Sequence, residues 1–484
     1  MAQPARTLRQ QPVHAAGGTP PHHPARTPAP RGVPTRRPGA TLAVTALATA
    51  VALMNYTSPL TTVPAVSAAL ATPASAQAWL INGTPLGLAV FLLVAGSLAD
   101  DYGRRRLFLI GTLALGVTTA AGALATTTLA FTLARVAQGA ASAAILATSL
   151  GLLVGAFPAG AARIRATGIW GAFVSGGIAL GPLLAGSLGT IDWRLTYAVL
   201  GLASLVTTAF AFRTLSESRA PRGGRPDLVG AAALGLAMTA LLSALTLGRD
   251  GWLRVPVALL LLAALALTAV FTAVERRAAA PLIELSLLRS RPFLTSSAGG
   301  LFTGLAVIGL FSYLPTLLQG TLGLSAMGTA WLFLLWSGSS FVVALQARRL
   351  TGRVSARHQL AAGFALHAVA VVTLLGVLDS PHAPTAGVWL RLIPALLVSG
   401  VGSGLLNAAL PRVAVESVPP ERAAMGSGAN NTARYIGSSA GVAVTIAVAT
   451  SGGGADAALL LSVGLALAAT VGVMLLRDRP LPLR

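Results

Sequence analysis

Long apolar runs recur along almost the whole chain and are separated by short polar segments. A helix needs about 20 apolar residues to cross a hydrocarbon core about 30 Å thick. Fourteen runs near that length can be delimited: 41–66, 79–99, 107–126, 128–153, 164–190, 195–213, 228–247, 255–274, 294–318, 327–347, 359–378, 387–411, 425–450 and 456–476. Neighbouring helices can satisfy the backbone groups that Gly and Pro free within such runs. The pattern therefore predicts an all-α membrane protein with fourteen transmembrane helices.

The composition supports a lipid environment and excludes several kinds of chemistry. Hydrophobic residues make up 54% of the chain and charged residues 10%, whereas soluble domains carry about 25% charged residues. The chain has no Cys, so disulfides, thiolate metal sites and cysteine nucleophiles are excluded. The net charge of +21 arises from 34 basic residues, all of them Arg, which cluster between the apolar runs. That distribution indicates membrane topology rather than nucleic-acid binding.

The distribution of Arg predicts which side of the membrane holds the termini. An even number of spans places both ends on one side, and Arg marks the cytoplasmic side. Four Arg residues lie at the opposite side and two lie inside runs, which leaves 28 of the 34 on the side of the termini. The first four are Arg194, Arg249, Arg254 and Arg391, and the other two are Arg135 and Arg434. We therefore expect a multi-pass protein of the cell (inner or plasma) membrane with both termini in the cytoplasm.

The polar segments suggest a division of the chain. Residues 1–40 are rich in Pro, Arg, His and Thr, bury too little apolar surface to fold, and are expected to form a disordered cytoplasmic tail. The longest polar linkers flank the seventh and eighth runs. This predicts a six-helix bundle at 41–213, linkers and two inserted helices at 214–291, a second six-helix bundle at 292–476 and a cytoplasmic tail at 477–484. Paired bundles of this kind are found in one large transporter architecture.

A motif follows the second run: Gly96-x-Leu98-Ala99-Asp100-x-x-Gly103-Arg104-Arg105-Arg106. Gly103 permits a tight turn, and Asp100 can pair with Arg or with a helix N-terminus across the interface between the bundles. Such a pair can break and re-form as the two halves rock, which predicts a gating role for the motif. The motif resembles the loop signature of the major facilitator superfamily. The alternative is that the three Arg residues only fix the orientation of the chain.

Two further runs carry motifs that resemble those of the same superfamily. In the fourth run, Arg135 precedes Gln138, and a buried Arg in the corresponding family motif influences proton movement. An Arg inside a span is costly unless it is paired or hydrated, so a functional role is expected. The alternative is a structural Arg that extends toward the membrane interface.

The fifth run contains small residues at regular intervals: Gly168, Gly177, Gly181, Pro182 and Gly186. Small residues along a helix let another backbone approach closely, and Pro bends the helix. The pattern resembles the motif that distinguishes antiporters from symporters and uniporters in this superfamily. Generic small-residue packing is the alternative interpretation.

Weaker cues in a matching order extend the resemblance to the fourteen-span drug:proton antiporter branch of the superfamily. They are Trp79, Asp192-Trp193-Arg194, Pro281-Leu282-Ile283-Glu284-Leu285, Gln319, Gly323-Leu324-Ser325 and Asn431-Thr432-Ala433-Arg434-Tyr435-Ile436-Gly437. The resemblance implies the major facilitator fold, with two six-helix bundles and two inserted helices. It also implies proton-coupled antiport by alternating access.

The first run departs from that branch, whose members commonly place an acid there. Here the corresponding segment is Asn55-Tyr56-Thr57-Ser58-Pro59, and none of the 13 acidic residues falls at mid-membrane. A lipophilic cation in a cavity of low dielectric needs a negative charge, whereas this chain offers Arg135 and Arg434. We therefore expect a neutral or anionic substrate. Cation–π attraction from Trp331 or Trp336 would weaken that expectation.

Proton coupling requires a titrating group. Asp100 at the membrane edge and His367 in the eleventh run are the candidates, together with Arg135. Histidine titrates near neutral pH, which suits such a role. The alternative for His367 is a packing residue whose nitrogens are satisfied by neighbours.

The sequence thus predicts a secondary active exporter of hydrophobic small molecules such as drugs and antibiotics. Ten residues are expected to contact substrate in the cavity: Asn55, Tyr56, Gln138, Gln319, Trp331, Trp336, Asn407, Asn430, Asn431 and Arg434. One alternative is an exporter dedicated to a single endogenous metabolite or antibiotic. Another is a non-transporting membrane sensor, which would leave the antiporter-like glycines unexplained.

Enzymatic chemistry is not expected. The sequence contains no recognisable paired-carboxylate site, Ser/His dyad, nucleotide-binding Gly-rich loop or metal cluster. We therefore expect neither metal nor cofactor, and no ATP-driven pumping by this chain alone. The expected partners are the small-molecule substrate, protons and the lipid bilayer, with no nucleic acid, and the protein is expected to be a monomer.

Overall fold

Helices make up nearly all of the chain that the structure describes. The structure, a computed structural model, describes residues 38–218, 227–248, 251–278, 281–282, 285–346, 349, 353–378 and 385–475. No strand occurs in these ranges, and the described helices belong to one compact unit. The predictions for the N-terminal tail up to residue 37, for residues 477–484, and for Ile283 and Glu284 lie outside the described residues.

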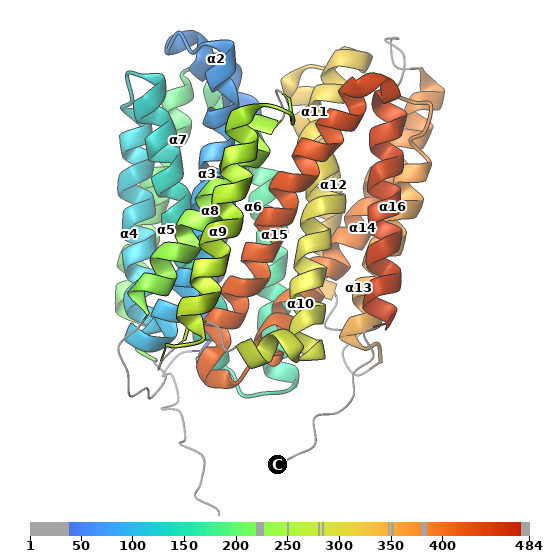
Figure 1. Cartoon of the computed structure of the whole chain (residues 1–484). Helices are drawn as coiled ribbons and strands as arrows, with labels where there is room; N and C mark the ends of the chain where they lie inside the picture. Colours follow the sequence, from blue (N-terminus) through green and yellow to red (C-terminus); the bar gives the residue numbers. More distant parts are fainter. Residues whose placement is uncertain are drawn as a thin grey trace, which may run out of the picture. The chain divides into compact units, whose positions relative to one another are not determined.

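The helices before residue 215, which we call the N-half helices, form one group. They are α1 (Pro38–Thr57), α2 (Pro59–Ala69), α3 (Ala74–Tyr102), α4 (Arg104–Ala123), α5 (Thr128–Ala156), α6 (Ala161–Gly189) and α7 (Trp193–Thr214). Helix α5 packs against α3 and α4 (Figure 1). Helix α1 packs against α6. The Thr127 hydroxyl accepts a hydrogen bond from Ala130 N at 3.1 Å and the Asp192 carboxylate accepts one from Arg194 N at 2.9 Å, which fixes the first turns of α5 and α7.

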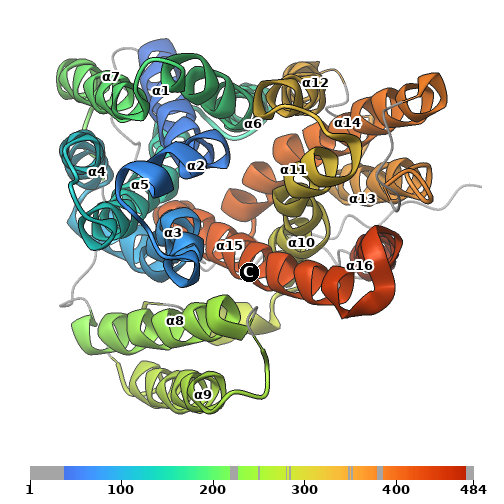
Figure 2. The same cartoon turned by 90° about the horizontal axis from the view of Figure 1, so that it is seen from above.

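The helices after residue 290, which we call the C-half helices, form the second group. They are α10 (Arg291–Phe302), the π-helical segment η2 (Thr303–Ile308), α11 (Gly309–Leu322), α12 (Ala326–Gln346), α13 (Ala356–Val372), α14 (Ala386–Glu416), α15 (Ala423–Val448), the π-helical segment η5 (Ala449–Gly453) and α16 (Gly454–Leu475). Helix α13 packs against α14 and α16, and α12 packs against α14. Seen from above, the N-half and C-half helices lie on opposite sides of a central line (Figure 2).

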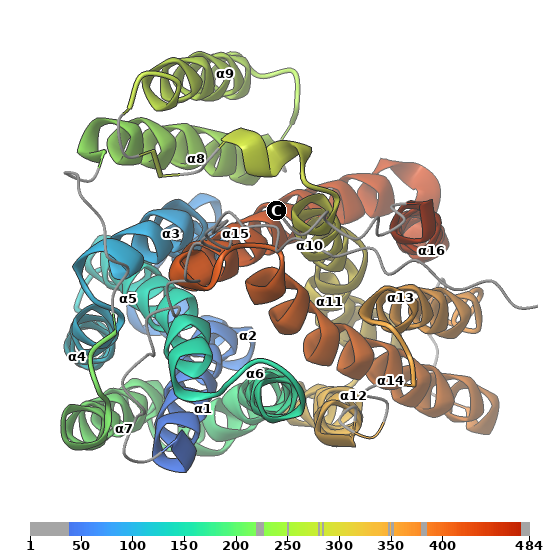
Figure 3. The same ribbon diagram turned by 90° about the horizontal axis from the view of Figure 1, so that it is seen from below.

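Helices α8 and α9 form a pair outside both groups. Helix α8 (Leu228–Gly248) packs against α9 (Val255–Glu275) and also contacts α3 and α15. The pair therefore covers the line along which α3 and α15 meet, as the views from above and below agree (Figures 2 and 3). Two short 3-10 helices, η1 (Leu285–Arg289) and η4 (Pro420–Arg422), precede α10 and α15.

The predicted runs and the observed helices agree closely, with corrections at their ends. Within the described residues, every predicted run coincides with one helix or with a series of helices. The first run, 41–66, is divided because α1 ends at Thr57 and Pro59 begins α2, as expected for Pro, which lacks a backbone donor. Helix α1 begins at Pro38, so helical structure starts before the predicted end of the tail at residue 40.

By length and composition, twelve helices or helix series in the described residues could cross a membrane. Helix α13 is not among them because it has 17 residues. Helix α15 has 26 residues, but it carries polar side chains such as Asn430, Asn431 and Arg434. The fold is therefore all-helical with twelve candidate membrane spans among the described residues.

Gly103 makes the sharp turn between α3 and α4. Its φ of +120° is disfavoured for residues with a side chain, and a Cβ there would lie 2.7 Å from the Glu217 carboxyl carbon. The Glu217 carboxylate accepts hydrogen bonds from the backbone N–H groups of Arg105 and Arg106 at 3.0 and 3.1 Å. An acid at a helix N-terminus is favourable, so the segment after α7 stabilises the start of α4.

Candidate functional site

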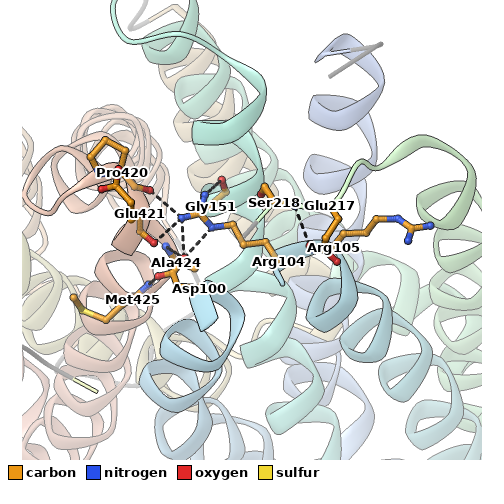
Figure 4. Close-up of polar contacts among 10 residues, drawn as sticks. All are labelled: Asp100, Arg104, Arg105, Gly151, Glu217, Ser218, Pro420, Glu421, Ala424 and Met425. Atoms are coloured by element: carbon orange, nitrogen blue, oxygen red, sulfur yellow. Dashed lines mark hydrogen bonds and ion pairs between the residues drawn. The ribbon is translucent and has the colours of Figure 1, made fainter. Parts of the chain in front are cut away.

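A buried ion pair lies where α3 ends and α4 begins. Asp100 is fully buried and Arg104 is 5% exposed. Arg104 Nε donates to Asp100 Oδ1 at 2.8 Å, and Nη1 donates to the Gly151 carbonyl of α5 at 3.0 Å. Arg104 Nη2 donates to the carbonyls of Pro420 and Glu421 at 2.9 and 3.0 Å. Arg104 therefore connects the N-half helices to η4 (Figure 4).

The Asp100 carboxylate also reaches the C-half helices directly. Its Oδ2 accepts a hydrogen bond from Met425 N at 2.9 Å and its Oδ1 accepts one from Ala424 N at 3.3 Å (Figure 4). These amides belong to the first turn of α15, where the helix dipole favours a negative charge. A Cβ at Gly96 would lie 2.5 Å from the Ala424 carbonyl oxygen, so the close approach of α3 to α15 depends on this glycine. We call the contacts of Asp100 and Arg104 with η4 and α15 the α3–α15 clamp.

The other two arginines of the motif lie outside the clamp. Arg105 Nη2 donates to the Phe212 carbonyl of α7 at 2.8 Å, and its guanidinium lies 5.2 Å from the centroid of the Phe212 ring. Arg106 is exposed. Arg104 therefore joins the N-half helices to η4, whereas Arg105 turns toward α7. The gating role of Arg105 and Arg106 stays a prediction.

A cavity of about 310 Å³ lies between the N-half and C-half helices. Part of its wall is aromatic, since the rings of Phe311 and Trp336 are stacked with their centroids 4.1 Å apart. Another part is polar and joins the two groups of helices. The hydroxyls of Ser175 and Ser340 lie 2.9 Å apart, and Asn407 Nδ2 donates to Ser175 Oγ at 3.0 Å. The cavity therefore offers both stacking surfaces and hydrogen-bonding groups.

Half of the predicted substrate contacts line this cavity. They are Tyr56, Trp336, Asn407, Asn431 and Arg434. They come from α1, α12, α14 and α15, so both groups of helices contribute.

The remaining predicted contacts do not line it. Trp331 is 59% exposed because it lies on the outer face of α12. Asn430 donates to the Ser296 carbonyl at 2.7 Å and so ties α15 to α10. Gln319 lies beside a much smaller pocket near Pro182. Asn55 and Gln138 accept hydrogen bonds from Arg135 instead. In each case the helix rotation, which the sequence pattern does not fix, turns the side chain away.

Arg135 is fully buried and lies outside the cavity lining. Its Nη1 donates to the backbone carbonyl of Asn55 at 2.9 Å, to Asn55 Oδ1 at 2.7 Å and to Gln138 Oε1 at 2.8 Å. Asn55 in turn donates to Thr119 Oγ1 at 2.8 Å, and Gln138 donates to the Thr118 carbonyl at 3.1 Å. Neutral oxygens therefore hold Arg135 inside the N-half helices.

The glycines of α6 allow two different helices, α1 and α12, to approach it closely. A Cβ at Gly177 or Gly181 would lie 2.6 Å from a carbonyl oxygen of α1, and one at Gly168 or Gly186 would face α12. The carbonyl of Pro182 accepts a hydrogen bond from a threonine of α2 at 3.3 Å. Helix α6 therefore packs tightly within its own group and across the boundary to the C-half helices.

His367 is fully buried and belongs to a chain of hydrogen bonds that begins at the cavity wall. Trp336 Nε1 donates to Ser399 Oγ at 3.2 Å, and Ser399 Oγ lies 2.9 Å from His367 Nδ1. On the other side, His367 Nε2 lies 3.1 Å from Ser462 Oγ, which donates to the Ala306 carbonyl at 2.8 Å.

The donors of this chain assign the protonation of the imidazole. Ser462 gives its proton to the Ala306 carbonyl, so its oxygen accepts from His367 Nε2–H. Nδ1 is then unprotonated and accepts from the Ser399 hydroxyl, while Ser399 Oγ accepts from Trp336. The network is fully satisfied by a neutral histidine. A proton added at Nδ1 would force the Ser399 hydroxyl to turn away.

Sequence reasoning did not identify several residues of the cavity wall. Serine hydroxyls of α12 and α15 line it, as do Leu245 and Thr246 of the inserted helix α8. Asn82 of α3 lies beside them and donates to Thr246 Oγ1 at 3.4 Å. Serine is common in helices, and α8 is separated from the two groups in sequence. The residue pattern therefore carried no signal for these positions.

Comparison with known proteins places this geometry in a family. The sequence model of the Major Facilitator Superfamily matches residues 45–442. The chain is 35% identical over 374 residues to the multidrug resistance protein Stp of Mycobacterium tuberculosis, covering 76% of this chain and 67% of that protein. It is 32% identical over 395 residues to a probable actinorhodin transporter of Streptomyces coelicolor, covering 79% and 67%.

A solved structure with a similar fold is that of the human organic anion transporter MFSD10. The two structures superpose with a TM-score of 0.65 over 90% of this chain and 99% of that chain. Their sequences are 17% identical, so this similarity concerns the fold alone.

The α3–α15 clamp predicts a strong effect of neutralising Asp100. Asp100→Asn leaves the Arg104 guanidinium buried without its carboxylate, and breaking a buried ion pair costs about 3–5 kcal/mol. We expect a clearly lower midpoint of thermal unfolding in detergent. The control is Glu416→Gln, which removes the acid of an Arg412–Glu416 pair at 3.1 Å whose Glu416 side chain is 43% exposed. Exposed pairs contribute about 0.2–1 kcal/mol, so equal losses in both variants would contradict a special role for the clamp.

The same variant should loosen the start of α15. Ser427 is fully buried and donates to the Leu146 carbonyl at 3.2 Å. Because the chain has no Cys, Ser427→Cys provides a single thiol. We expect this thiol to react at least tenfold faster with a maleimide when Asp100→Asn is present.

Proposed function

The chain belongs to the major facilitator superfamily, and from this premise we propose that it is a secondary active exporter of hydrophobic small molecules. The observation that carries the proposal is a central cavity with walls from both groups of helices, combined with a clamp that joins the groups at one end. Alternating access requires such an arrangement, because contacts on one side of a fixed site must break while others form. The relatives that are named as multidrug-resistance and antibiotic transporters support the same class of substrate.

We further propose that α13 and α15 also cross the membrane, which gives fourteen spans in two six-helix bundles with α8 and α9 inserted. Helix α13 falls only slightly short in length and packs against α14 and α16. Helix α15 is polar because it lines the cavity and is covered by α3, α5, α8 and α10. Polar side chains inside a membrane are tolerated where they face protein or a water-filled cavity.

The excess of Arg beside the clamp end supports an orientation with that end in the cytoplasm. Arg104, Arg105 and Arg106 form the first turn of α4, directly after the turn at Gly103, and cytoplasmic ends of membrane helices are rich in Arg. In this proposal the clamp closes the cavity toward the cytoplasm, and substrate passes through the opposite end, near the lining residues Leu60 of α2 and Thr316 of α11. This arrangement corresponds to the state from which a substrate is released to the outside.

Proton entry provides the driving force in this proposal. The hydrogen-bond chain links His367 through Ser399 to Trp336 of the cavity wall. A proton taken up by the imidazole would therefore change the hydrogen bonds that hold Trp336 in place. Asp100 is the second candidate because its charge holds the clamp. Protonation of either group would alter contacts that differ between the two states of the cycle.

Transport should depend on the tight contact between α1 and α6. A side chain at Gly181 would collide with Thr57 and with the Met54 carbonyl of α1. We expect Gly181→Leu and Pro182→Leu to reduce efflux of a lipophilic dye from vesicles at least tenfold with normal membrane insertion. The control is Gly189→Leu at the end of the same helix, where a Cβ meets no atom within 4 Å. Efflux at the original rate in the Gly181→Leu variant would contradict the dependence on this contact, whereas an unmodified protein that gives no more efflux than protein-free vesicles would argue for a sensor.

Coupling through His367 is tested by separating driven transport from exchange. His367→Asn keeps a hydrogen-bonding side chain but removes the group that titrates. In proteoliposomes we expect this variant to lose accumulation driven by a pH gradient, while exchange of labelled for unlabelled substrate continues. Full pH-driven accumulation by His367→Asn would remove His367 from the coupling mechanism and leave Asp100 as the candidate.

A further inference from the structure

The central cavity contains one charged side chain. Among the residues that line it, Arg434 is cationic and none is Asp or Glu. No hydrogen bond or ion pair joins the Arg434 guanidinium to another residue in the part of the chain that the structure describes. Arg104 and Arg135 differ in this respect, because each donates several hydrogen bonds to protein oxygens. Arg434 is therefore a cation whose partner is not supplied by the described protein.

The surroundings of Arg434 fit an aromatic ligand. Tyr56 and Tyr435 line the same cavity and pack edge to face, with their ring centroids 5.7 Å apart. The stacked Phe311–Trp336 pair forms another part of the wall. A cation in a site of low dielectric needs a compensating charge or strong acceptors, and a guanidinium binds planar oxyanions through two parallel hydrogen bonds.

Building on the proposed exporter, we propose that Arg434 forms a subsite for one anionic group on an otherwise apolar, aromatic substrate. The group is a carboxylate, phenolate or enolate, whose negative charge the guanidinium binds. The aromatic walls hold the apolar scaffold. This subsite distinguishes acidic substrates from neutral analogues of the same shape.

The test compares 1-pyrenebutyric acid with its methyl ester, which has the same scaffold without the charge. Energy transfer from tryptophan to pyrene measures binding to the purified protein in phosphatidylcholine nanodiscs. We expect the acid to bind at least tenfold more tightly than the ester, and Arg434→Gln to abolish that difference. Arg412→Gln at the exposed Arg412–Glu416 pair is the control, because it changes the net charge equally but should preserve the preference.

Equal binding of acid and ester by the unmodified protein, or failure of the acid to bind, would overturn the anionic subsite. Retention of the preference in Arg434→Gln would do the same. Because the readout is binding, a charge preference without any transport in vesicles would contradict the proposed exporter while leaving the subsite intact.

A separate observation concerns the inserted helices. Helix α8 lies outside both groups of helices (Figures 2 and 3), yet Leu245 and Thr246 near its end line the central cavity. The neighbouring wall comes from Asn82 of α3 and from Val442 and Ile446 of α15. The cavity therefore reaches between α3 and α15 as far as α8, which closes it on that side.

The two ends of α8 are held differently. Near its start, Ala231 and Leu234 belong to an apolar cluster with Leu93 of α3 and Met425 of α15. Near its end, Leu242 belongs to an apolar cluster with Leu88 and Ala89 of α3, and Leu245 packs against the same cluster. Asn82 also donates a long hydrogen bond of 3.4 Å to Thr246 Oγ1 there. On the far side, α9 presents exposed leucines. The start of α8 is therefore anchored beside the clamp, and its end packs against α3 where it borders the cavity.

We infer that the end of α8 is a movable side wall, and that lipid-dissolved substrates enter or leave the cavity between α3 and α15 when it swings outward. Apolar molecules concentrate in the hydrocarbon rather than in water, so a lateral route gives them direct access. The anchored start of α8 serves as the pivot.

The absence of Cys makes this movement accessible to cross-linking. In the double variant Asn82→Cys/Thr246→Cys, a short reducible bis-methanethiosulfonate fastens the end of α8 to α3. The control is Val90→Cys/Gly235→Cys on the same two helices, because a Cβ at Gly235 would lie 3.6 Å from Val90 Cγ1. The probe is 1-pyrenebutyric acid dissolved in the nanodisc lipid, and its association rate is followed by energy transfer.

We expect the cross-link at 82/246 to slow association at least tenfold, with the original rate restored by reductant and the equilibrium affinity unchanged. The cross-link at 90/235 should leave the rate unchanged, since it lies near the pivot. Unchanged association after the first cross-link, or equal slowing by both, would overturn the lateral route. Lack of probe binding to the reduced protein would also contradict it.

Discussion

The arrangement of the two groups of helices depends on one buried carboxylate that satisfies donors from both. Asp100 accepts from Arg104 within its own group and from two amides in the first turn of α15. A buried carboxylate with fewer donors would be costly to keep ionised, and the start of α15 would lose a favourable charge. The same interaction therefore stabilises both the α3–α4 corner and the junction with the other group. Because it consists of a few directional contacts, it can be made in one arrangement of the helices and broken in another.

Three buried or half-buried arginines illustrate how the protein treats charge in an apolar setting. Arg104 has a carboxylate and three carbonyls, Arg135 has neutral side-chain and backbone oxygens, and Arg434 lines the cavity without a described partner. The partners of Arg104 are explained by its role in stabilising the fold, and those of Arg135 can be explained in the same way. Stabilisation of the fold does not explain the position of Arg434, because an unpaired cation destabilises the cavity wall in which it lies. A site that is left incomplete in this way is consistent with a ligand that completes it.

Much of the fold could be predicted because length and apolarity determine membrane helices almost by themselves. The runs in the sequence matched the helices closely, and the motif around Asp100 indicated a contact with a helix N-terminus. The cavity was harder to predict because it depends on helix rotation. Trp331 and Trp336 are five residues apart on α12, yet one faces outward and the other lines the cavity. Asn55 and Gln138 were expected in the cavity because they are polar. Instead, their side-chain oxygens accept hydrogen bonds from the buried guanidinium of Arg135.

The polarity of α15 explains why the inserted pair matters to the whole arrangement. Helix α15 carries Asn430, Asn431 and Arg434, and it is not among the twelve described helices or helix series that are long and apolar enough to cross a membrane. A helix of this kind is stable in a bilayer only when other helices cover it. Helices α3, α5 and α10 cover part of it, and α8 contacts it as well. The α8–α9 pair thus helps a polar helix to occupy the boundary between the two groups, where it forms the clamp at its start and lines the cavity along its length. Helix α8 therefore contributes to the cavity as well as to the packing of α15, which its position between two linkers in the sequence did not indicate.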